Sequence, residues 1–204
     1  MADQFKKDKK LSRQLKKLSS KLVEKAVREL GRRSSKSRGE GVHNARKRLK
    51  QLRGILRLVQ HGISQKSYRR ENRAFRNAGR PLSDVRDADI MIETLDQLIV
   101  HFSHQVKAHS FRRLRRILVE RRRQIRKQLL EKERSMGKIS ASLRKAERRI
   151  KNWTSISNDY KILMRGVEST YAQGKNEMDT ALTEKSDETL HTWRKSVKYL
   201  RYQL

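Results

Sequence analysis

Leucines recur at every third or fourth position near the start of the chain. Between residues 8 and 30 the apolar positions are Leu11, Leu15, Leu18, Leu22, Ala26 and Leu30. Spacing of this kind places side chains on one face of an α-helix. Lysines occupy the other faces. The pattern therefore predicts an amphipathic helix with one face buried.

The next segment, GRRSSKSRGEG at residues 31–41, contains glycine, serine and charge but no apolar residue. This composition predicts a loop. A second helix is predicted over about residues 42–59 and a third over residues 65–80. Pro81 is expected to end the third helix, because proline disfavours helical backbone in the residue before it.

The segment after Pro81, DVRDADIMIETLDQLIVHF, is the most apolar in the chain. A fourth helix is predicted there, capped by Ser83 or Asp84, and is expected to lie at the centre of the core. A long helical pattern follows over about residues 109–133, and a break is predicted near Met136 and Gly137. Further helices are predicted over about residues 138–152, 157–175 and 186–204.

These patterns place the chain in the all-α class. It contains one proline and nine glycines, and few runs of alternating polar and apolar residues. The last helical pattern reaches Leu204 without a glycine, asparagine or proline stop signal. We interpret it as a helix cut in mid-pattern, and expect the natural protein to continue.

The charge of the chain indicates the kind of partner that it binds. The chain has 204 residues, with 53 Lys plus Arg against 22 Asp plus Glu, a net charge of +31 and a pI near 11.2. Such a surplus indicates a polyanionic partner. The absence of cysteine excludes disulfides, thiolate metal sites and a cysteine nucleophile. No signal peptide or long apolar run is present, so a cytoplasmic protein without membrane association is expected.

One stretch of sequence occurs twice. Residues 42–56 read VHNARKRLKQLRGIL, and residues 190–204 read LHTWRKSVKYLRYQL. The identical pairs are His43/His191, Arg46/Arg194, Lys47/Lys195, Lys50/Lys198, Leu52/Leu200, Arg53/Arg201 and Leu56/Leu204. At about 100° per residue the histidine and the cations form one stripe on each helix. The apolar positions lie on the opposite side, so each helix has a core face and a cationic face.

A run of Lys and Arg on a helix is often only a solvated face. Two observations favour a ligand here. Neither stripe contains a carboxylate, so like charges stack along the helix at a cost of a few tenths of a kcal/mol per pair. The two copies also agree along the stripe while differing at neighbours such as Arg48 and Ser196. The repeat predicts one anion site built from two related walls.

The histidines allow three interpretations. A neutral imidazole donates one hydrogen bond, and a neighbouring polyanion raises its pKa so that both ring nitrogens donate. The side chain can instead simply pack in the first turn of its helix. A metal site is disfavoured, because His43 and His191 have no Asp, Glu or Cys at ligand spacing in their stripes.

These segments resemble the CHAD family, the conserved-histidine α-helical domains. The pattern H-x-x-R-K-x-x-K-x-x-R occurs from His43 to Arg53 and again from His191 to Arg201. PLSDVRDADIMIETL resembles the family's L-x-x-x-R-D-x-D motif, and GVESTYAQGKNEM resembles the segment before its second histidine helix. The residues that carry these two matches are Arg86, Asp87, Asp89, Tyr171, Gly174 and Lys175.

The resemblance spans essentially the whole chain and implies a single domain over residues 1–204. It implies long-helix bundles in two halves related by pseudo-two-fold symmetry, here residues 1–150 and the start of the second half at 151–204. The helices expected after the second histidine stretch are absent, so the second half is incomplete. The resemblance also implies a basic central groove, inorganic polyphosphate as the ligand and association with polyphosphate granules.

The first functional hypothesis is therefore a non-catalytic polyphosphate-binding domain. Its expected ligands are His43, Arg46, Lys47, Lys50, Arg53, His191, Arg194, Lys195, Lys198 and Arg201. Secondary candidates, which would extend the groove, are Arg57, Arg73, Arg76, Arg80 and Arg86. For Arg86, a structural pairing with Asp87 or Asp89 is an equal alternative.

Two other functions compete with this one. The charge alone supports a sequence-independent nucleic-acid binder, although the stripes contain no ladder of aromatic side chains for base stacking. An enzyme of phosphoryl transfer would need Mg²⁺ held by carboxylates. The tight acidic cluster, Asp84, Asp87 and Asp89, lies in the most apolar segment and suits a buried Asp–Arg network better. No catalytic residue, metal or cofactor is predicted, and the oligomeric state is left open.

Overall fold

The protein is built from α-helices throughout its described part. The computed structural model describes residues 9–31, 35–105, 107–131, 133–153, 156 and 158–204. Within these ranges it has no strand, and its elements are α1 (Leu11–Leu30), α2 (Ser35–Leu58), η1 (Gln60–Gly62), α3 (Gln65–His101), η2 (Ala108–Phe111), α4 (Arg112–Glu131), α5 (Glu133–Lys151), α6 (Lys161–Glu184) and α7 (Asp187–Gln203). The prediction of an all-α fold is confirmed.

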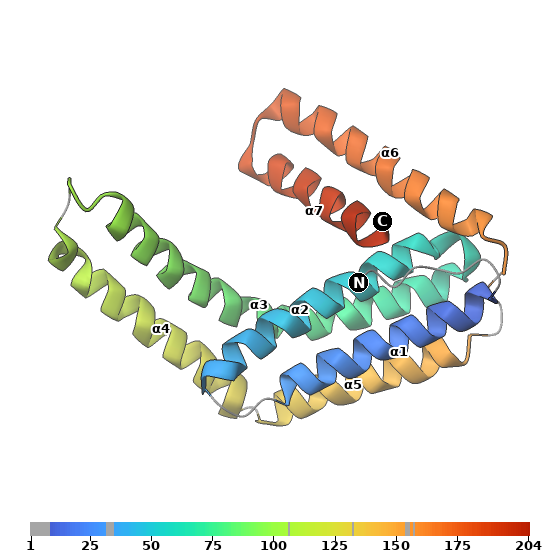
Figure 1. Ribbon diagram of the computed structural model, residues 1–204, viewed down its shortest axis with the longest axis horizontal. Helices are drawn as coiled ribbons and strands as arrows, with labels where there is room; N and C mark the ends of the chain where they lie inside the picture. Colours follow the sequence, from blue (N-terminus) through green and yellow to red (C-terminus); the bar gives the residue numbers. More distant parts are fainter. Residues whose placement is uncertain (1–8, 32–34, 106, 132, 154–155, 157) are drawn as a thin grey trace.

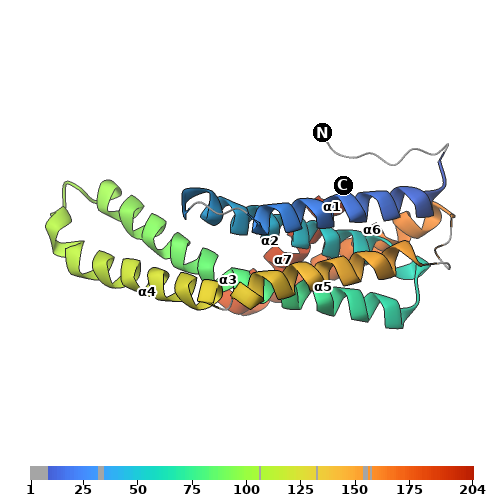
Figure 2. The same ribbon diagram turned by 90° about the horizontal axis from the view of Figure 1, so that it is seen from below.

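The core lies among α1, α2, α5 and the first half of α3. Helix α1 packs on α2 and α5, and α3 packs on α2 and α5, so the four form a bundle (Figures 1 and 2). The leucine stripe of α1 is buried as predicted, apart from Leu18, which is partly buried. The apolar face predicted for the first repeat is also buried, at Val42, Ala45, Leu49, Leu52 and Leu56.

Pro81 does not end a helix, which corrects the prediction of separate third and fourth helices. It lies inside α3, which runs continuously from Gln65 to His101. Proline removes one helical hydrogen bond, but the apolar positions keep their spacing across it. The buried residues on this stripe are Phe75, Ala78, Leu82 and Val85. Packing of one unbroken stripe therefore overrides the local preference of proline.

Two predicted loops are also helical. Helix α2 begins at Ser35, inside the segment expected to be a loop, while residues 32–34 lie outside the described ranges. A Cβ on Gly39 would lie 3.1 Å from an Arg126 nitrogen of α4, so this glycine permits close packing. The break expected at Met136 and Gly137 falls inside α5, because Met136 packs on the core and continues the α5 stripe.

The most apolar segment is not at the centre of the core. The second half of α3 leaves the bundle and pairs with α4, and we call this pair the arm (Figure 1). Ile92 and Leu95 are buried against α4, but Ile90 and Leu98 are 41% and 47% exposed. The second half of α3 is covered by α4 alone, so only one of its sides is buried. Its high apolar content therefore does not place it at the centre of the core.

Helices α6 and α7 form a hairpin that docks on α2. Gly166 of α6 lies against the backbone of Leu58, and any Cβ at this position would overlap the Leu58 carbonyl. Unlike α2, α7 leaves much of its apolar face uncovered, at Leu190, Val197 and Leu204. The boundary expected at residue 150 falls at the end of α5, and the two-fold relation of the halves stays a prediction.

We expect the two repeats to differ in their contribution to stability. Leu49→Ala should lower the free energy of unfolding by about 2–5 kcal/mol, because Leu49 is 3% exposed and its removal leaves a cavity. Leu190→Ala, the same change at a position 42% exposed, should alter it by less than about 0.5 kcal/mol. Urea denaturation of both variants measures the difference. Equal losses would show that the α7 face is buried in solution.

Candidate functional site

The cationic stripes of α2 and α7 meet. The pKa of Lys50 is lowered by burial and then by the charges of Arg46, Lys198 and Arg194. The pKa of Lys198 is lowered by burial and then by Arg194 and Arg46. Lys50 and Lys198 occupy the same position of the two repeats, as do Arg46 and Arg194. The structure thus brings repeated residues together, and we call these four the cation cluster.

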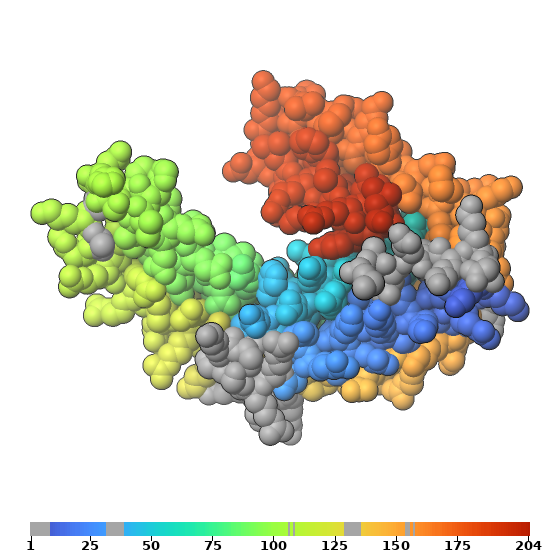
Figure 3. All heavy atoms as spheres, viewed as in Figure 1, coloured from blue at the N-terminus to red at the C-terminus, as the bar shows by residue number. Residues whose placement is uncertain are grey.

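The cluster belongs to helices that border an open hollow. Figure 3 shows this hollow between the arm and α7, with α2 as its floor. Arg46 is half-buried and lies 3.9 Å from Asp87 of α3. Burial lowers the pKa of Arg46 although Asp87 opposes the shift. Asp84 opposes the shift as well, so two carboxylates act on a cluster of four cations, which keeps a surplus of positive charge.

Arg53 and Arg57 hold α7 against α2. The Arg57 and Arg53 guanidiniums lie 4.4 Å and 5.3 Å from the centre of the Tyr199 ring. Arg53 also donates from Nε to Asn72 Oδ1 at 2.8 Å, and Arg57 donates from Nη1 to Gln173 Oε1 at 3.0 Å. Burial is the largest cause that lowers the pKa of Arg53. These two predicted ligands thus also position the helices.

Sequence reasoning missed the residues that receive these arginines, Tyr199, Asn72 and Gln173. A position where the two repeats differ does indicate that their helices touch. Tyr202 aligns with Gly54, and a Cβ on Gly54 would lie 2.9 Å from the Tyr202 Cβ. A large residue in one copy is thus matched by the smallest in the other at their point of contact.

His43 lies among cations at the end of α2 nearest to the arm. Its pKa is lowered by burial first, and then by Arg86, Arg46, Lys47 and Lys50. All four neighbouring charges are positive, so they disfavour the imidazolium form. The neutral imidazole is thereby favoured at neutral pH.

Arg86 pairs with Glu93, which corrects the proposed pairing with Asp87 or Asp89. Its Nη1 and Nη2 donate to the two Glu93 oxygens at 2.9 Å and 3.1 Å. Asp89 instead accepts from Arg126 Nη2 of α4 at 2.8 Å and is almost fully buried. Asp89 thus belongs to a buried Asp–Arg pair, as expected, but one that joins α3 to α4.

The arginines on the exposed edge of α3 divide between two places. Arg76 lies close enough to Arg53 to lower its pKa and so belongs near the hollow. Arg73 lines a separate cavity between α3 and α5 together with Arg149. Arg80 is exposed. That all three extend one groove stays a prediction.

The remaining predicted ligands are exposed on the two stripes. Lys47 lies beside His43 on α2, and its charge contributes to the lowered pKa of that histidine. His191, Lys195 and Arg201 are exposed on α7, and none of them bonds or ion-pairs with another described residue. Their role as ligands stays a prediction.

Within the described ranges, no group of three His, Asp or Glu side chains is arranged to hold a metal ion. None of the helices in those ranges is long and apolar enough to cross a bilayer.

Comparison with known proteins gives one match. The model of the CHAD domain family matches residues 9–204. No curated protein and no solved structure matches the chain.

The cationic surroundings of His43 lead to a measurable expectation. Its pKa should lie below 6.5 in the unliganded protein, and Arg86→Gln should raise it, because this change removes the strongest of the neighbouring charges. NMR titration of the imidazole carbons measures both values, with the other histidines as internal controls. A His43 pKa at or above 6.5, or one insensitive to Arg86, would contradict this electrostatic picture.

Proposed function

The chain belongs to the CHAD domain family, and from this premise we propose that it binds inorganic polyphosphate without catalysing a reaction. The observation that carries the proposal is the meeting of Lys50 and Lys198, with Arg46 and Arg194 beside them, between α2 and α7. The family supports the ligand, and this convergence supports the place where it binds.

The cluster has the electrostatics of an anion-binding site. Lysines and arginines from two helices are held together although they repel one another and although burial weakens their charged forms. A phosphate chain entering the hollow would replace this repulsion by attraction. Guanidinium groups grip two phosphoryl oxygens at once, and lysine ammonium groups supply compact charge.

We propose that the ligand follows a groove with α2 as its floor and α7 as one wall. His43, Arg46, Lys50 and Arg76 would line it from the α2 and α3 side. His191 and the basic side chains of α7, Arg194, Lys195, Lys198 and Arg201, would line the opposite side. His43 would take up a proton as the anion arrives, since a neighbouring negative charge raises the pKa of an imidazole.

A binding role fits the carboxylates of this region better than a catalytic one. Asp89 is engaged by Arg126, Glu93 by Arg86, and Asp87 lies beside Arg46. Phosphoryl transfer needs carboxylates that are available to hold Mg²⁺. We therefore propose no catalytic residue and no cofactor. In the cell, binding of this kind would place the protein on polyphosphate granules in the cytoplasm.

Charge reversal in the cluster tests the site. Lys50→Glu/Lys198→Glu should weaken binding of long-chain polyphosphate at least about 100-fold, taking about 1.4 kcal/mol, or tenfold, for each cation lost. The fold should be retained, because the substitutions also relieve repulsion between the two lysines and Arg46 and Arg194. Titration calorimetry gives the affinity, and circular dichroism reports the helical content.

The matched control is Lys17→Glu/Arg28→Glu, which changes the net charge equally at exposed positions of α1. It should retain most of the affinity. If the control and the cluster variant lose the same amount, the protein binds through its overall charge and the groove is not the site.

Competition separates polyphosphate from nucleic acid, which the charge of +31 would also attract. At equal phosphate concentration, polyphosphate should displace duplex DNA far more readily than DNA displaces polyphosphate. A single phosphate chain is flexible and can follow the cation cluster, whereas duplex DNA is stiff over such a distance. Fluorescence anisotropy of a labelled duplex measures the exchange. Equal or stronger retention of DNA would favour a nucleic-acid binder. The salt concentration must be fixed, because both anions release counterions on binding.

A further inference from the structure

A second cationic cavity lies on the other side of α3, away from the cation cluster. It has a volume of about 660 Å³ and lies between the first half of α3 and α5. The residues that define its chemistry are Lys66, Arg69, Arg70, Arg73, Asn77 and Arg149. The repeated stripes do not account for this cavity, because all of its lining residues lie on α3 and α5.

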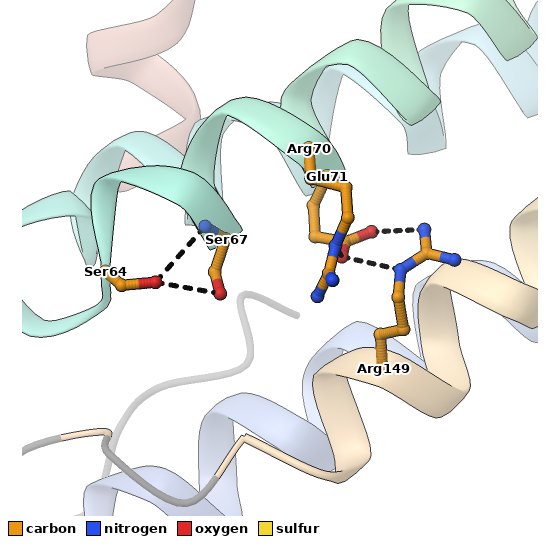
Figure 4. A network of polar contacts seen from close by, with 5 residues as sticks. All are labelled: Ser64, Ser67, Arg70, Glu71 and Arg149. Atoms are coloured by element: carbon orange, nitrogen blue, oxygen red, sulfur yellow. Dashed lines mark hydrogen bonds and ion pairs between the residues drawn. The ribbon is translucent and has the colours of Figure 1, made fainter.

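A buried carboxylate organises two of its arginines. The Glu71 side chain is fully buried, and it accepts from Arg149 Nε at 2.8 Å and Arg149 Nη2 at 2.6 Å (Figure 4). It also accepts from Arg70 Nε at 2.8 Å. The hydrogen bond to Glu71 is the largest cause that raises the pKa of Arg149. Both guanidiniums are thus fixed in place as well as charged.

In this arrangement several hydrogen-bond donors of Arg70 and Arg149 are not used by Glu71. Nη1 of Arg149 and both terminal nitrogens of Arg70 make no bond to any other described residue. Both side chains stay partly exposed, at 32% for Arg149 and 48% for Arg70. Donors that are held in position and open to solvent form a preorganised anion site, because little side-chain entropy remains to be lost on binding.

The charge of the cavity is strongly unbalanced. Five cationic side chains line it, and Glu71 beneath them is the one carboxylate bonded to two of those cations. The lining also includes Gln65 and Lys66, which lie in the first turn of the 37-residue helix α3. This first turn contains no acidic residue. The N-terminal end of a helix carries partial positive charge and attracts anions. Monovalent anions would not neutralise such a site, and consecutive phosphoryl groups would.

We propose that this cavity is a second phosphoanion site, which binds a run of two or three consecutive phosphoryl groups. Its volume is within the range of small-ligand pockets. The fixed guanidinium of Arg149 would bind one phosphoryl group at the floor. Arg69 and Arg73, which lie one turn apart on α3, would bind the next groups from the rim.

Such a run has two possible sources. One is a free short oligophosphate. The other is part of a long polyphosphate chain that also occupies the groove, because Arg76 near Arg53 follows Arg73 on the same edge of α3. The second source rests on the proposed function, whereas the first does not.

Inorganic tripolyphosphate is the probe for the cavity itself. Its affinity is measured by calorimetry in the Lys50→Glu/Lys198→Glu protein, which removes competition from the groove, with and without Arg69→Ala/Arg73→Ala. The cavity substitutions should weaken tripolyphosphate binding at least about tenfold, which corresponds to about 1.4 kcal/mol. Arg69 and Arg73 are exposed, so these changes leave the buried Glu71 network and the fold intact.

The control is Arg13→Ala/Arg28→Ala, which removes two exposed arginines from α1, a helix that packs on α2 and α5. An unchanged tripolyphosphate affinity in the cavity variant, or an equal loss in this control, would overturn the proposal.

Long-chain polyphosphate then distinguishes the two sources, using Arg69→Ala/Arg73→Ala in the otherwise unaltered protein. If the long chain and tripolyphosphate both bind more weakly, the cavity holds a segment of the chain that occupies the groove. If the tripolyphosphate alone binds more weakly, the cavity takes free short oligophosphates. Failure of the groove proposal is seen separately, as long-chain binding that is indifferent to Lys50→Glu/Lys198→Glu.

Discussion

Apolar packing beneath α2 holds together charges that repel one another. Six buried apolar residues of this helix, from Val42 to Leu56, pack against its neighbours, and each large side chain contributes about 1.5–3 kcal/mol. The repulsion between neighbouring cations near the surface is smaller, a few tenths of a kcal/mol for each pair on one helix. Packing therefore outweighs the repulsion, and Lys198 lies close enough to Lys50 to lower its pKa although Asp87 opposes the shift. Every feature of the proposed groove depends on this balance.

Closely spaced cations are accommodated differently on the two sides of α3. On the side of α2, cations meet with little compensation, and burial and mutual repulsion lower their pKa values. On the side of α5, the fully buried Glu71 neutralises part of the charge and fixes two arginines. In the cation cluster, a bound anion would reduce the repulsion between the cations. In the cavity beside α5, the arginine donors are already held in place for an anion. One helix thus separates two kinds of anion-binding surface.

Local patterns were sufficient where a residue's structure depends on its neighbours in sequence. The leucine stripe of α1 and the two faces of α2 follow from a period of 3.6, and both are observed. The pattern failed where distant residues decide. Pro81 stays helical because the stripe of α3 packs without a break, and Gly39 lies in a helix that packs closely against Arg126 of α4.

The candidate site shows the same limit. The repeated stripes identified the cations of the cluster, but the pairing of Arg86 with Glu93 rather than Asp87 could not be seen from spacing alone. Tyr199 was missed because nothing in its own segment says that Arg53 and Arg57 lie over its ring. The Arg86–Glu93 pair lies within α3, so the choice among several nearby carboxylates decided it. For Tyr199 the outcome depended on contacts between distant segments, which sequence periodicity does not encode.

Gly166 shows how a residue without charge can govern a charged site. Its backbone touches that of Leu58, so α6 rests directly on the end of α2 and carries α7 with it. The smallest side chain at this position would wedge the hairpin outward and separate one row of cations from the other. During evolutionary drift, single exposed lysines and arginines can be exchanged at little cost to the fold, whereas this glycine has no substitute. The spacing between the two rows of cations thus depends on Gly166, a residue outside the proposed anion site.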